Sequence, residues 1–280
     1  MQYYNLRDKT VSRHIGHLFP DWEEGNERVA VLSPHDDDAV IGAGGLICTA
    51  MENGAQVYIF IFCNGDGGYS DAKLKDTIVD IRAKETVKAY KALGLPEDHI
   101  VRFDLSDFSV KPYIGWKMPW GRAGINYYHI KKLRELRITR MLIPNGYREH
   151  TDHEAVHYIG FYDSPQAGDP ILMDWGLPSV IKTTMVYSVW SDFTPEDSVL
   201  NKTDFNIRAN RAIKYPKDME DRIRRAIRQW ESQGEIIKDL VTRREERACD
   251  DCYIELYLDV SPRPKLRYQP YIQMIKEIDK

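Results

Sequence analysis

Cysteine is scarce in this chain, and long apolar runs are absent. Four cysteines in 280 residues are too few for the disulfide framework of a small secreted protein. No stretch approaches the roughly 18 apolar residues that a membrane-spanning helix needs, and residues 1–20 lack the apolar centre of a signal peptide. The sequence therefore predicts a cytoplasmic protein without a membrane anchor.

A strong excess of one charge is also absent. The 39 basic and 43 acidic residues give a net charge of −4, so no overall field favours nucleic acid or an anionic membrane. The basic runs at 222–228 and 243–247 alternate with acidic residues, which is typical of solvated helix faces. We expect neither nucleic acid nor a membrane as a partner.

One C-x-x-C pair is present, at Cys249 and Cys252. A four-cysteine zinc site needs a second pair, which the sequence does not contain. A redox pair typically opens a helix after a strand, whereas this pair precedes a strand-like segment at 253–260. We interpret it as two small residues at the entrance of a strand.

Strand and helix patterns alternate along the first 190 residues. Apolar runs predict strands at 28–33, 56–63, 99–103, 138–144 and 182–190, and amphipathic spacing predicts helices at 46–53, 77–93, 129–136 and 152–162. We expect an irregular arm at 1–26, a long loop at 104–128, helices within 216–247 and a strand at 253–260. This order predicts an α/β fold, with a Rossmann-like, mostly parallel sheet flanked by helices. It also suggests one catalytic domain over 1–280, with its core at about 27–190 and a charged helical C-terminal extension at about 200–280 packed on it.

Two clusters of histidine and acidic residues each follow a predicted strand. The segments are His35-Asp36-Asp37-Asp38 and Glu149-His150-Thr151-Asp152-His153-Glu154. Ligands of open α/β sheets bind beyond the carboxyl ends of the strands, so both clusters should reach one crevice. Carboxylates gathered there repel one another unless a cation lies among them. Either cluster alone is compatible with helix capping; together they predict a metal site.

The two clusters resemble the motifs of the GlcNAc-phosphatidylinositol deacetylase-like (PIG-L or LmbE-like) superfamily of zinc N-deacetylases. That superfamily carries (P/A)-H-P-D-D-E after its first strand and H-x-D-H further along. This chain has Pro34-His35-Asp36-Asp37-Asp38-Ala39 and His150-Thr151-Asp152-His153, and the resemblance extends over about 27–190. Two residues beside the expected ligands depart from the motif: Asp36 replaces a proline and Ala39 replaces a glutamate.

The resemblance implies that one zinc ion per chain is bound by His35, Asp38 and His153. Two imidazoles and one carboxylate form a catalytic zinc site with an open position for water. Zinc lowers the pKa of that water to about 7, which supplies a nucleophile near neutral pH.

Other roles follow from the same resemblance. Asp37 would be the general base, and His150 would stabilise the oxyanion or protonate the leaving amine. Asp152 would orient or tune His150. Arg82, in an R-x-x-E motif, would face the substrate pocket, and Asp107 would hold sugar hydroxyls.

The activity so implied is zinc-dependent hydrolysis of the acetamide of an N-acetylated amino sugar or a related small glycoside. Whether the chain forms a homo-oligomer is left open.

Three alternatives remain at this point. The segment 153–157 reads H-E-A-V-H, a metalloprotease pattern with His153 and His157 as ligands and Glu154 as base. Two histidines and a carboxylate also suit a non-haem iron oxygenase, and the two motif departures suit a non-catalytic sugar- or metal-binding member of the superfamily.

Overall fold

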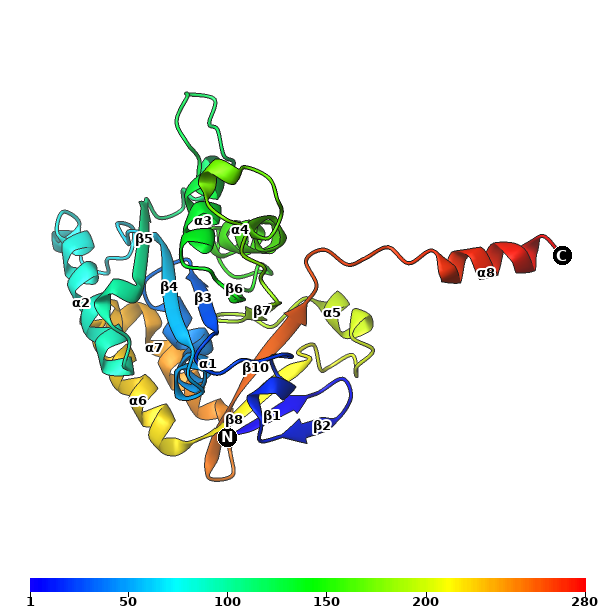
Figure 1. Ribbon diagram of the computed structural model, residues 1–280. Helices are drawn as coiled ribbons and strands as arrows, with labels where there is room; N and C mark the ends of the chain where they lie inside the picture. Colours follow the sequence, from blue (N-terminus) through cyan, green and yellow to red (C-terminus); the bar gives the residue numbers. More distant parts are fainter.

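A single ten-stranded sheet forms the centre of the computed structural model, which describes all residues 1–280 (Figure 1). Its strands are β1 Gln2–Asn5, β2 Thr10–Ser12, β3 Arg28–Ser33, β4 Gln56–Cys63, β5 Ile100–Leu105, β6 Arg140–Pro144, β7 Thr183–Tyr187, β8 Arg211–Pro216, β9 Ala248–Cys249 and β10 Cys252–Val260. The spatial order is β2-β1-β8-β10-β7-β6-β3-β4-β5, with β9 paired to β10. Strands β3 to β7 pair in parallel, and the remaining strands add an antiparallel part beyond β7. The predicted α/β class with a parallel central sheet is confirmed.

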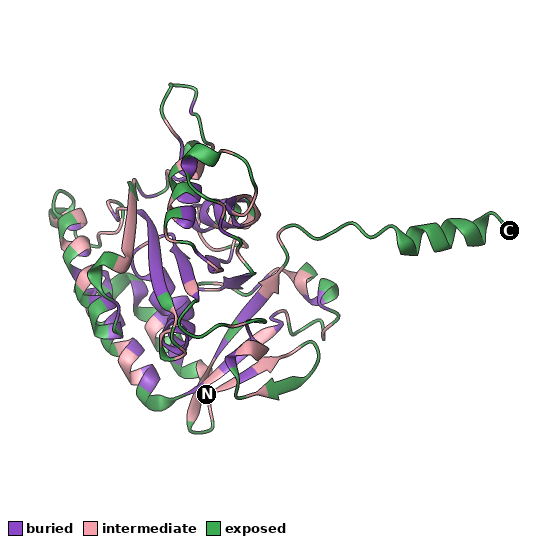
Figure 2. Ribbon diagram, in the orientation of Figure 1, coloured by how far each residue is buried: buried purple, intermediate pink, exposed green.

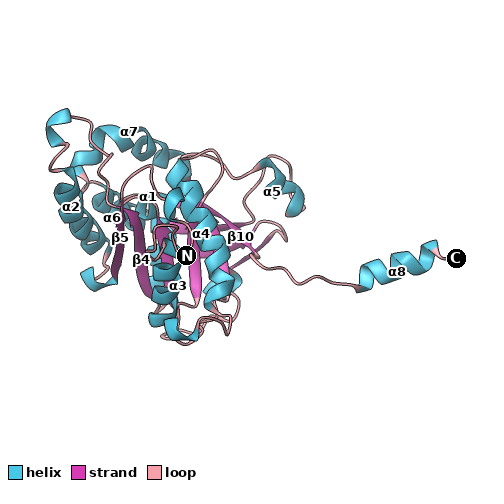
Figure 3. Cartoon of the chain, turned by 90° about the horizontal axis from the view of Figure 1, so that it is seen from above, coloured by secondary structure: helices cyan, strands magenta, loops and turns pink.

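Helices cover both faces of the parallel part (Figure 3). The α-helices of the structure are α1 Asp38–Glu52, α2 Ile78–Leu93, α3 Ile125–Glu135, α4 Thr151–Ala167, α5 Pro195–Leu200, α6 Lys217–Ile227, α7 Gly234–Arg243 and α8 Gln269–Ile278. Of these, α5 and α8 lie away from the parallel strands. Side chains alternate between the two faces of a strand, so Val29 and Val31 of β3 join the apolar core under α1, α2 and α6, whereas Ala30 and Leu32 join a second core under α3 and α4. Figure 2 shows β3 and β4 largely buried and β5, at the edge of the sheet, only partly buried.

Several elements differ from the sequence-based prediction. The N-terminal segment is not irregular, because β1 pairs with β8 and with β2. Strand β8 was not predicted at all, and β7 ends at Tyr187 rather than at 190. The region 216–247 forms two helices, α6 and α7, as expected. Strands β8 and β10 of the C-terminal region lie within the same sheet as β3 and β6.

Helix α1 begins at Asp38, eight residues before the predicted start at 46. Three glycines in this stretch favour an irregular segment, since each lowers helix propensity. The structure requires two of them because of close packing: a Cβ on Gly42 would lie 2.4 Å from the ring of Tyr187, and one on Gly45 would lie 2.6 Å from the ring of Tyr215. Tertiary contacts therefore outweigh the local propensity.

A kink divides α1 at Ala43, whose φ and ψ of −135° and 20° are not helical. The kink frees backbone groups that need other partners. The Arg244 guanidinium donates to the Ile41 carbonyl at 2.8 Å, and the Glu255 carboxylate accepts from the Gly45 N–H at 3.0 Å. Charged residues of the C-terminal region thus satisfy the backbone of the helix that begins with Asp38.

The last twenty residues leave the body of the protein as an arm that ends in α8 (Figure 1). From Arg263 onward every residue of this arm is exposed. None of the helices combines the length and the apolar composition that a membrane span requires. At the other end of β10, Cys249 and Cys252 are register partners in the β9–β10 hairpin, and both are free thiols.

Candidate metal centre

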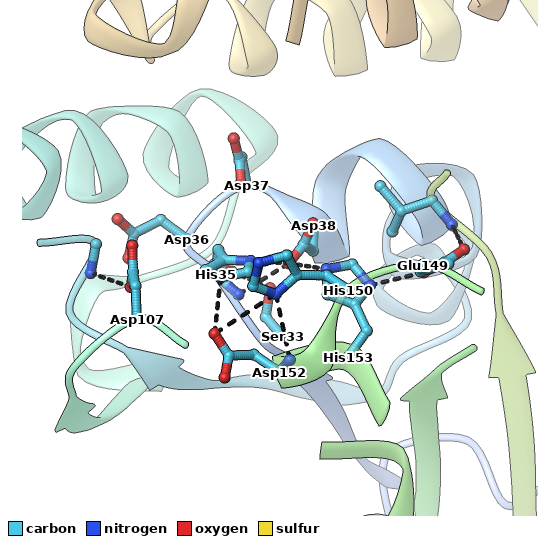
Figure 4. A network of polar contacts seen from close by, with 12 residues as sticks. Ser33, His35, Asp36, Asp37, Asp38, Asp107, Glu149, His150, Asp152 and His153 are labelled. Atoms are coloured by element: carbon cyan, nitrogen blue, oxygen red, sulfur yellow. Dashed lines mark hydrogen bonds and ion pairs between the residues drawn. The ribbon is translucent and has the colours of Figure 1, made fainter. Parts of the chain in front are cut away.

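Two adjacent parallel strands bring the two sequence clusters together. β3 and β6 are hydrogen-bonded neighbours, so their carboxyl ends lie at the same edge of the sheet. Helix α1 starts with Asp38 shortly after β3, and α4 starts at Thr151 shortly after β6. The imidazoles and carboxylates therefore meet above this edge, as Figure 4 shows.

His35, Asp38 and His153 converge on one point. Asp38 Oδ2 lies 3.1 Å from His35 Nδ1 and 3.1 Å from His153 Nε2. One donor atom from each of the three residues lies within 4.8 Å of the other two. The three residues that the resemblance implies as ligands are thus brought together by the fold.

The surroundings of His153 suit a metal ligand. Its Nδ1 lies 2.6 Å from Glu149 Oε2, which places the ring proton on Nδ1 and leaves the lone pair of Nε2 facing Asp38. This Nε2 is buried and has no hydrogen-bond partner. A histidine backed by a carboxylate is the usual arrangement around a protein-bound metal. Glu149 had no predicted role, although its position one turn before a candidate ligand is a signal visible in the sequence.

The electrostatics of the centre call for a positive charge. Burial alone would lower the pKa of His153, but Asp38 and Glu149 raise it to about 9. Burial alone would raise the pKa of Asp38, but His153 and His35 hold it well below its usual range. A divalent cation bound among the same side chains would supply this positive charge in place of bound protons. The residues present therefore fit a metal ion.

Two other groups containing His35 have suitable spacing but less suitable chemistry. One includes Cys63, whose thiol pKa is raised to about 12 by burial, which disfavours the thiolate needed for coordination. The other includes Asp152, whose oxygens already accept the Phe108 and Val110 N–H groups at 2.7 and 3.3 Å. Asp152 Oδ2 lies 3.4 Å from His35 Nε2, so this carboxylate stands behind His35 as Glu149 stands behind His153.

Three consecutive aspartates have three different environments. Asp36 is fully buried and forms ion pairs with Arg82 at 2.8 Å and with Arg102 at 3.0 Å, which compensates the charge that replaces the proline of the motif. Asp37 points in another direction (Figure 4) and lines a pocket. Burial raises the pKa of Asp37 to about 6 against the opposing effect of Arg82, which lies 3.8 Å away.

His150 lies at the N-cap of α4 with its ring partly exposed in the pocket. Its Nδ1 accepts the Asp152 backbone N–H at 3.2 Å, so a neutral ring carries its proton on Nε2. Burial and the neighbouring His35 lower the pKa of His150. A neutral imidazole with a free N–H can donate a hydrogen bond to an oxygen or a proton to a leaving group. Asp152, which the resemblance assigns to His150, lies 3.5 Å from the His150 ring and also contacts His35.

Arg82 lines the pocket, but its guanidinium is already engaged by protein groups. Besides Asp36, it donates to Gln233 Oε1 at 3.1 Å, and Gln233 in turn donates to the Gly68 carbonyl at 2.7 Å. A Cβ on Gly68 would lie 2.0 Å from the guanidinium, which explains the glycine-rich turn at 64–68. Gln233 comes from the C-terminal region and was not identified from the sequence, since nothing local marks it.

Asp107 also borders the pocket, beside the same turn. Its two oxygens accept the Gly65 and Gly67 N–H groups, each at 3.0 Å. The carboxylate therefore holds the turn in place at the border of the pocket. The sequence analysis assigned it only to sugar hydroxyls.

The metalloprotease pattern at 153–157 does not form a metal site. His157 Nδ1 donates to the Pro144 carbonyl at 2.8 Å, and His157 lines a different cavity from His35 and Asp38. Glu154 is exposed and pairs with Lys111. His157 and Glu154 are thus separated from the centre that contains His153.

Comparison with known proteins finds a family model and a curated relative that are similar to the segment containing this centre. Residues 30–161 match the PIG-L family model, described as GlcNAc-PI de-N-acetylase. A diacetylchitobiose deacetylase from Thermococcus kodakarensis is 24% identical over 148 residues, which are 51% of this chain and 51% of that protein. The match thus spans about half the length of this curated relative.

Solved structures share the fold. The N,N'-diacetylchitobiose deacetylase from Pyrococcus horikoshii superposes with a TM-score of 0.63 at 19% identity, covering 84% of each chain. The 4-carboxy-2-hydroxymuconate hydratase from Pseudomonas putida does so with a TM-score of 0.55 at 17% identity, covering 86% of this chain and 99% of that chain. The resemblance seen in the sequence motifs is confirmed, and the fold is one that also carries a hydratase.

Proposed function

We propose that this chain is a zinc-dependent N-deacetylase, because residues 30–161 match the PIG-L family model. Its substrate would be an N-acetylated amino sugar or a related small glycoside, as for the diacetylchitobiose deacetylases that it resembles. The observation that carries the proposal is the convergence of His35, Asp38 and His153 beside a pocket that also contains Asp37 and His150.

Each residue has a chemical task in this proposal. His35, Asp38 and His153 would hold one zinc ion, which when bound supplies a Lewis acid for the amide carbonyl and for water. Asp37 would take the proton of the attacking water, since its raised pKa of about 6 makes it a base suited to neutral pH.

The leaving amine needs a proton, because an amide anion is a poor leaving group. His150 would supply it from Nε2, or would donate a hydrogen bond to the carbonyl oxygen as that oxygen gains negative charge. Arg82, held by Asp36 and Gln233, would stabilise the ionised form of Asp37 rather than bind substrate directly.

Because a hydratase has the same fold, the fold does not determine the reaction, and the residues of the site must do so. A hydratase adds water across a carbon–carbon double bond and releases no acetate. Acetate release from N-acetylglucosamine and N,N'-diacetylchitobiose, scored with the zinc content of the purified protein, therefore separates the two reactions. An iron oxygenase would instead consume oxygen.

Variants of three residues test the assigned roles. Asp37→Ala should retain zinc and lose about 10²–10⁴-fold in kcat, the usual contribution of a general base. His153→Ala should lose both zinc and turnover. His157→Ala is the matched control, since His157 lies outside the pocket, and should retain both. Turnover at the wild-type level in Asp37→Ala would contradict the proposal.

A further inference from the structure

The pocket beside the metal centre has two chemically different sides. Its volume is about 370 Å³, near the lower end of the range for small-molecule sites. One side is polar and is formed by the metal-centre residues with Arg82 and Asp107. The other is apolar and is formed by six side chains: Ile41, Phe108, Trp190, Ile236, Ile237 and Leu240.

Three of the apolar side chains are more exposed than a core requires. Phe108 is 67% exposed, Trp190 41% and Ile236 39%. They come from the segments after β5 and β7 and from α7, so distant parts of the chain place large apolar groups at one pocket. Clustered exposed apolar groups beside polar ones mark a binding surface.

The backbone holds Phe108 in a conformation that a bulky residue rarely adopts. Its φ is +61°, a left-handed conformation that costs of order 1–3 kcal/mol in a residue with a side chain. Its N–H donates to Asp152, and its ring lies 4.4 Å from the His150 ring. Strain of this kind is concentrated at functional sites, and here it fixes an exposed aromatic ring against a candidate catalytic residue.

The other two side chains are also anchored to the centre. The Trp190 backbone N–H donates at 3.0 Å to Glu149, the carboxylate that contacts His153. Ile236 lies one turn after Gln233, which binds Arg82 and the Gly68 carbonyl. The apolar side is therefore a fixed wall next to the reacting groups.

We infer that Phe108, Trp190 and Ile236 form a subsite for an apolar group of the substrate, attached close to the acetamido sugar. The inference rests on the proposed deacetylase function and specifies its substrate class as amphiphilic. The apolar group has two chemical sources, an alkyl or aryl aglycone of a glycoside or an N-acyl chain longer than acetyl. Two of the three subsite residues, Trp190 and Ile236, lie outside the family-matched segment 30–161.

Three substrates test the inference: N-acetylglucosamine, its hexyl β-glycoside and N-hexanoylglucosamine. Burial of only two or three methylene groups should raise kcat/KM for one extended substrate by about tenfold or more over the free sugar. A preference for the hexyl glycoside identifies the apolar group as an aglycone, and a preference for N-hexanoylglucosamine identifies it as an acyl chain.

Ile236→Ser should reduce this preference to near unity, mainly through KM. Ile207→Ser is the matched control, because Ile207 is 49% exposed and does not line the pocket; it should keep the preference. Equal kcat/KM for all three substrates in the wild type would overturn the subsite while leaving the deacetylase proposal intact.

Binding supplies a readout that does not depend on turnover. Tryptophan fluorescence should respond to one of the two extended ligands, the hexyl glycoside or N-hexanoylglucosamine, at concentrations at least about tenfold below those needed for the free sugar. Trp190→Phe should remove the response. If no substrate releases acid, the proposed function fails, and the fluorescence titration alone decides the subsite. Equal dissociation constants for the free sugar and for both extended ligands, the hexyl glycoside and N-hexanoylglucosamine, would refute it.

Discussion

Arg244→Met tests whether the C-terminal region stabilises the helix that carries Asp38. Arg244 is fully buried, and its guanidinium binds both oxygens of Glu220 at 2.8 and 2.6 Å and the Ile41 carbonyl at 2.8 Å. Methionine keeps the length of the side chain but removes the charge and every donor. The variant therefore leaves a buried carboxylate and a buried carbonyl with fewer partners.

The expected loss follows from what remains around these groups. Removing one partner of a buried ion pair costs about 3–5 kcal/mol. Glu220 keeps Arg224 at 2.7 Å and Tyr215 at 3.0 Å, and the Ile41 carbonyl keeps Arg247 at 3.0 Å, so we expect about 3 kcal/mol, the lower end of that range. For a chain of this length the unfolding entropy is about 0.6 kcal/mol/K, which converts the loss to a fall of about 5 °C in Tm.

Thermal unfolding followed by circular dichroism measures this change. Arg263→Met is the matched control, because Arg263 pairs with Asp169 at the exposed base of the arm, and its Tm should equal that of the wild type. The double variant Arg244→Met/Glu220→Met should recover much of the loss, since removing a buried pair entirely is far less costly than breaking it. A Tm for Arg244→Met within 1 °C of the wild type would refute the reasoning.

Three further predictions concern charge, metal and strain. Burial alone would raise the pKa of Glu27, but hydrogen bonds, first from Arg140, lower it to about 2. The contribution of ionised Glu27 to stability is therefore complete above a pH of about 4.5 and is lost as the pH falls through about 2. Glu27→Gln should accordingly make Tm depend less steeply on pH in this acidic range. Added zinc should raise Tm by several degrees through mass action, and His153→Ala should abolish the rise; an equal rise in the variant would contradict the assigned ligand. Phe108→Gly should maintain or raise Tm, because it relieves an unfavourable φ at an exposed position, while weakening fluorescence-detected binding of the hexyl glycoside.

The parallel part of the sheet was predictable because its strands carry strong local signals. The runs at 28–33 and 56–63 are continuous and apolar, as expected for strands buried on both faces, and they became β3 and β4. β8 has no such run: Arg211 and Lys214 interrupt it, and its place in the sheet depends on pairing with β1 and β10. Pairing between distant segments leaves no local pattern to detect.

The same contrast applies to the site. The candidate ligands His35, Asp38 and His153 stand in two short motifs, so the clusters predicted a metal site and the resemblance to the family motifs implied these three ligands. Gln233, the residue before α7, and Ile236, within α7, reach the pocket from some 150 residues after Arg82 and the glycine-rich turn. Only the packing of α6 and α7 against α1 and α2 brings them there. No local sequence pattern predicts that packing.

The three consecutive aspartates show how the departures from the family motif fit the proposed chemistry. Asp36 has two arginines as partners, Arg82 and Arg102, and Asp38 has two imidazoles. Asp37 has a weaker partner, since Arg82 approaches it only to 3.8 Å, beyond hydrogen-bond distance. A carboxylate buried without a full partner holds its proton more tightly. Because Asp36 engages Arg82, Asp37 remains the one aspartate of the three that is suited to accept a proton near neutral pH. Replacement of Asp36 by proline, the residue usual in the motif, should then free Arg82 to move toward Asp37 and lower the pKa of the Asp37 carboxyl. The acid limb of the pH–rate profile should shift to lower pH. An unshifted acid limb would mean that Asp36 has no part in setting the pKa of Asp37.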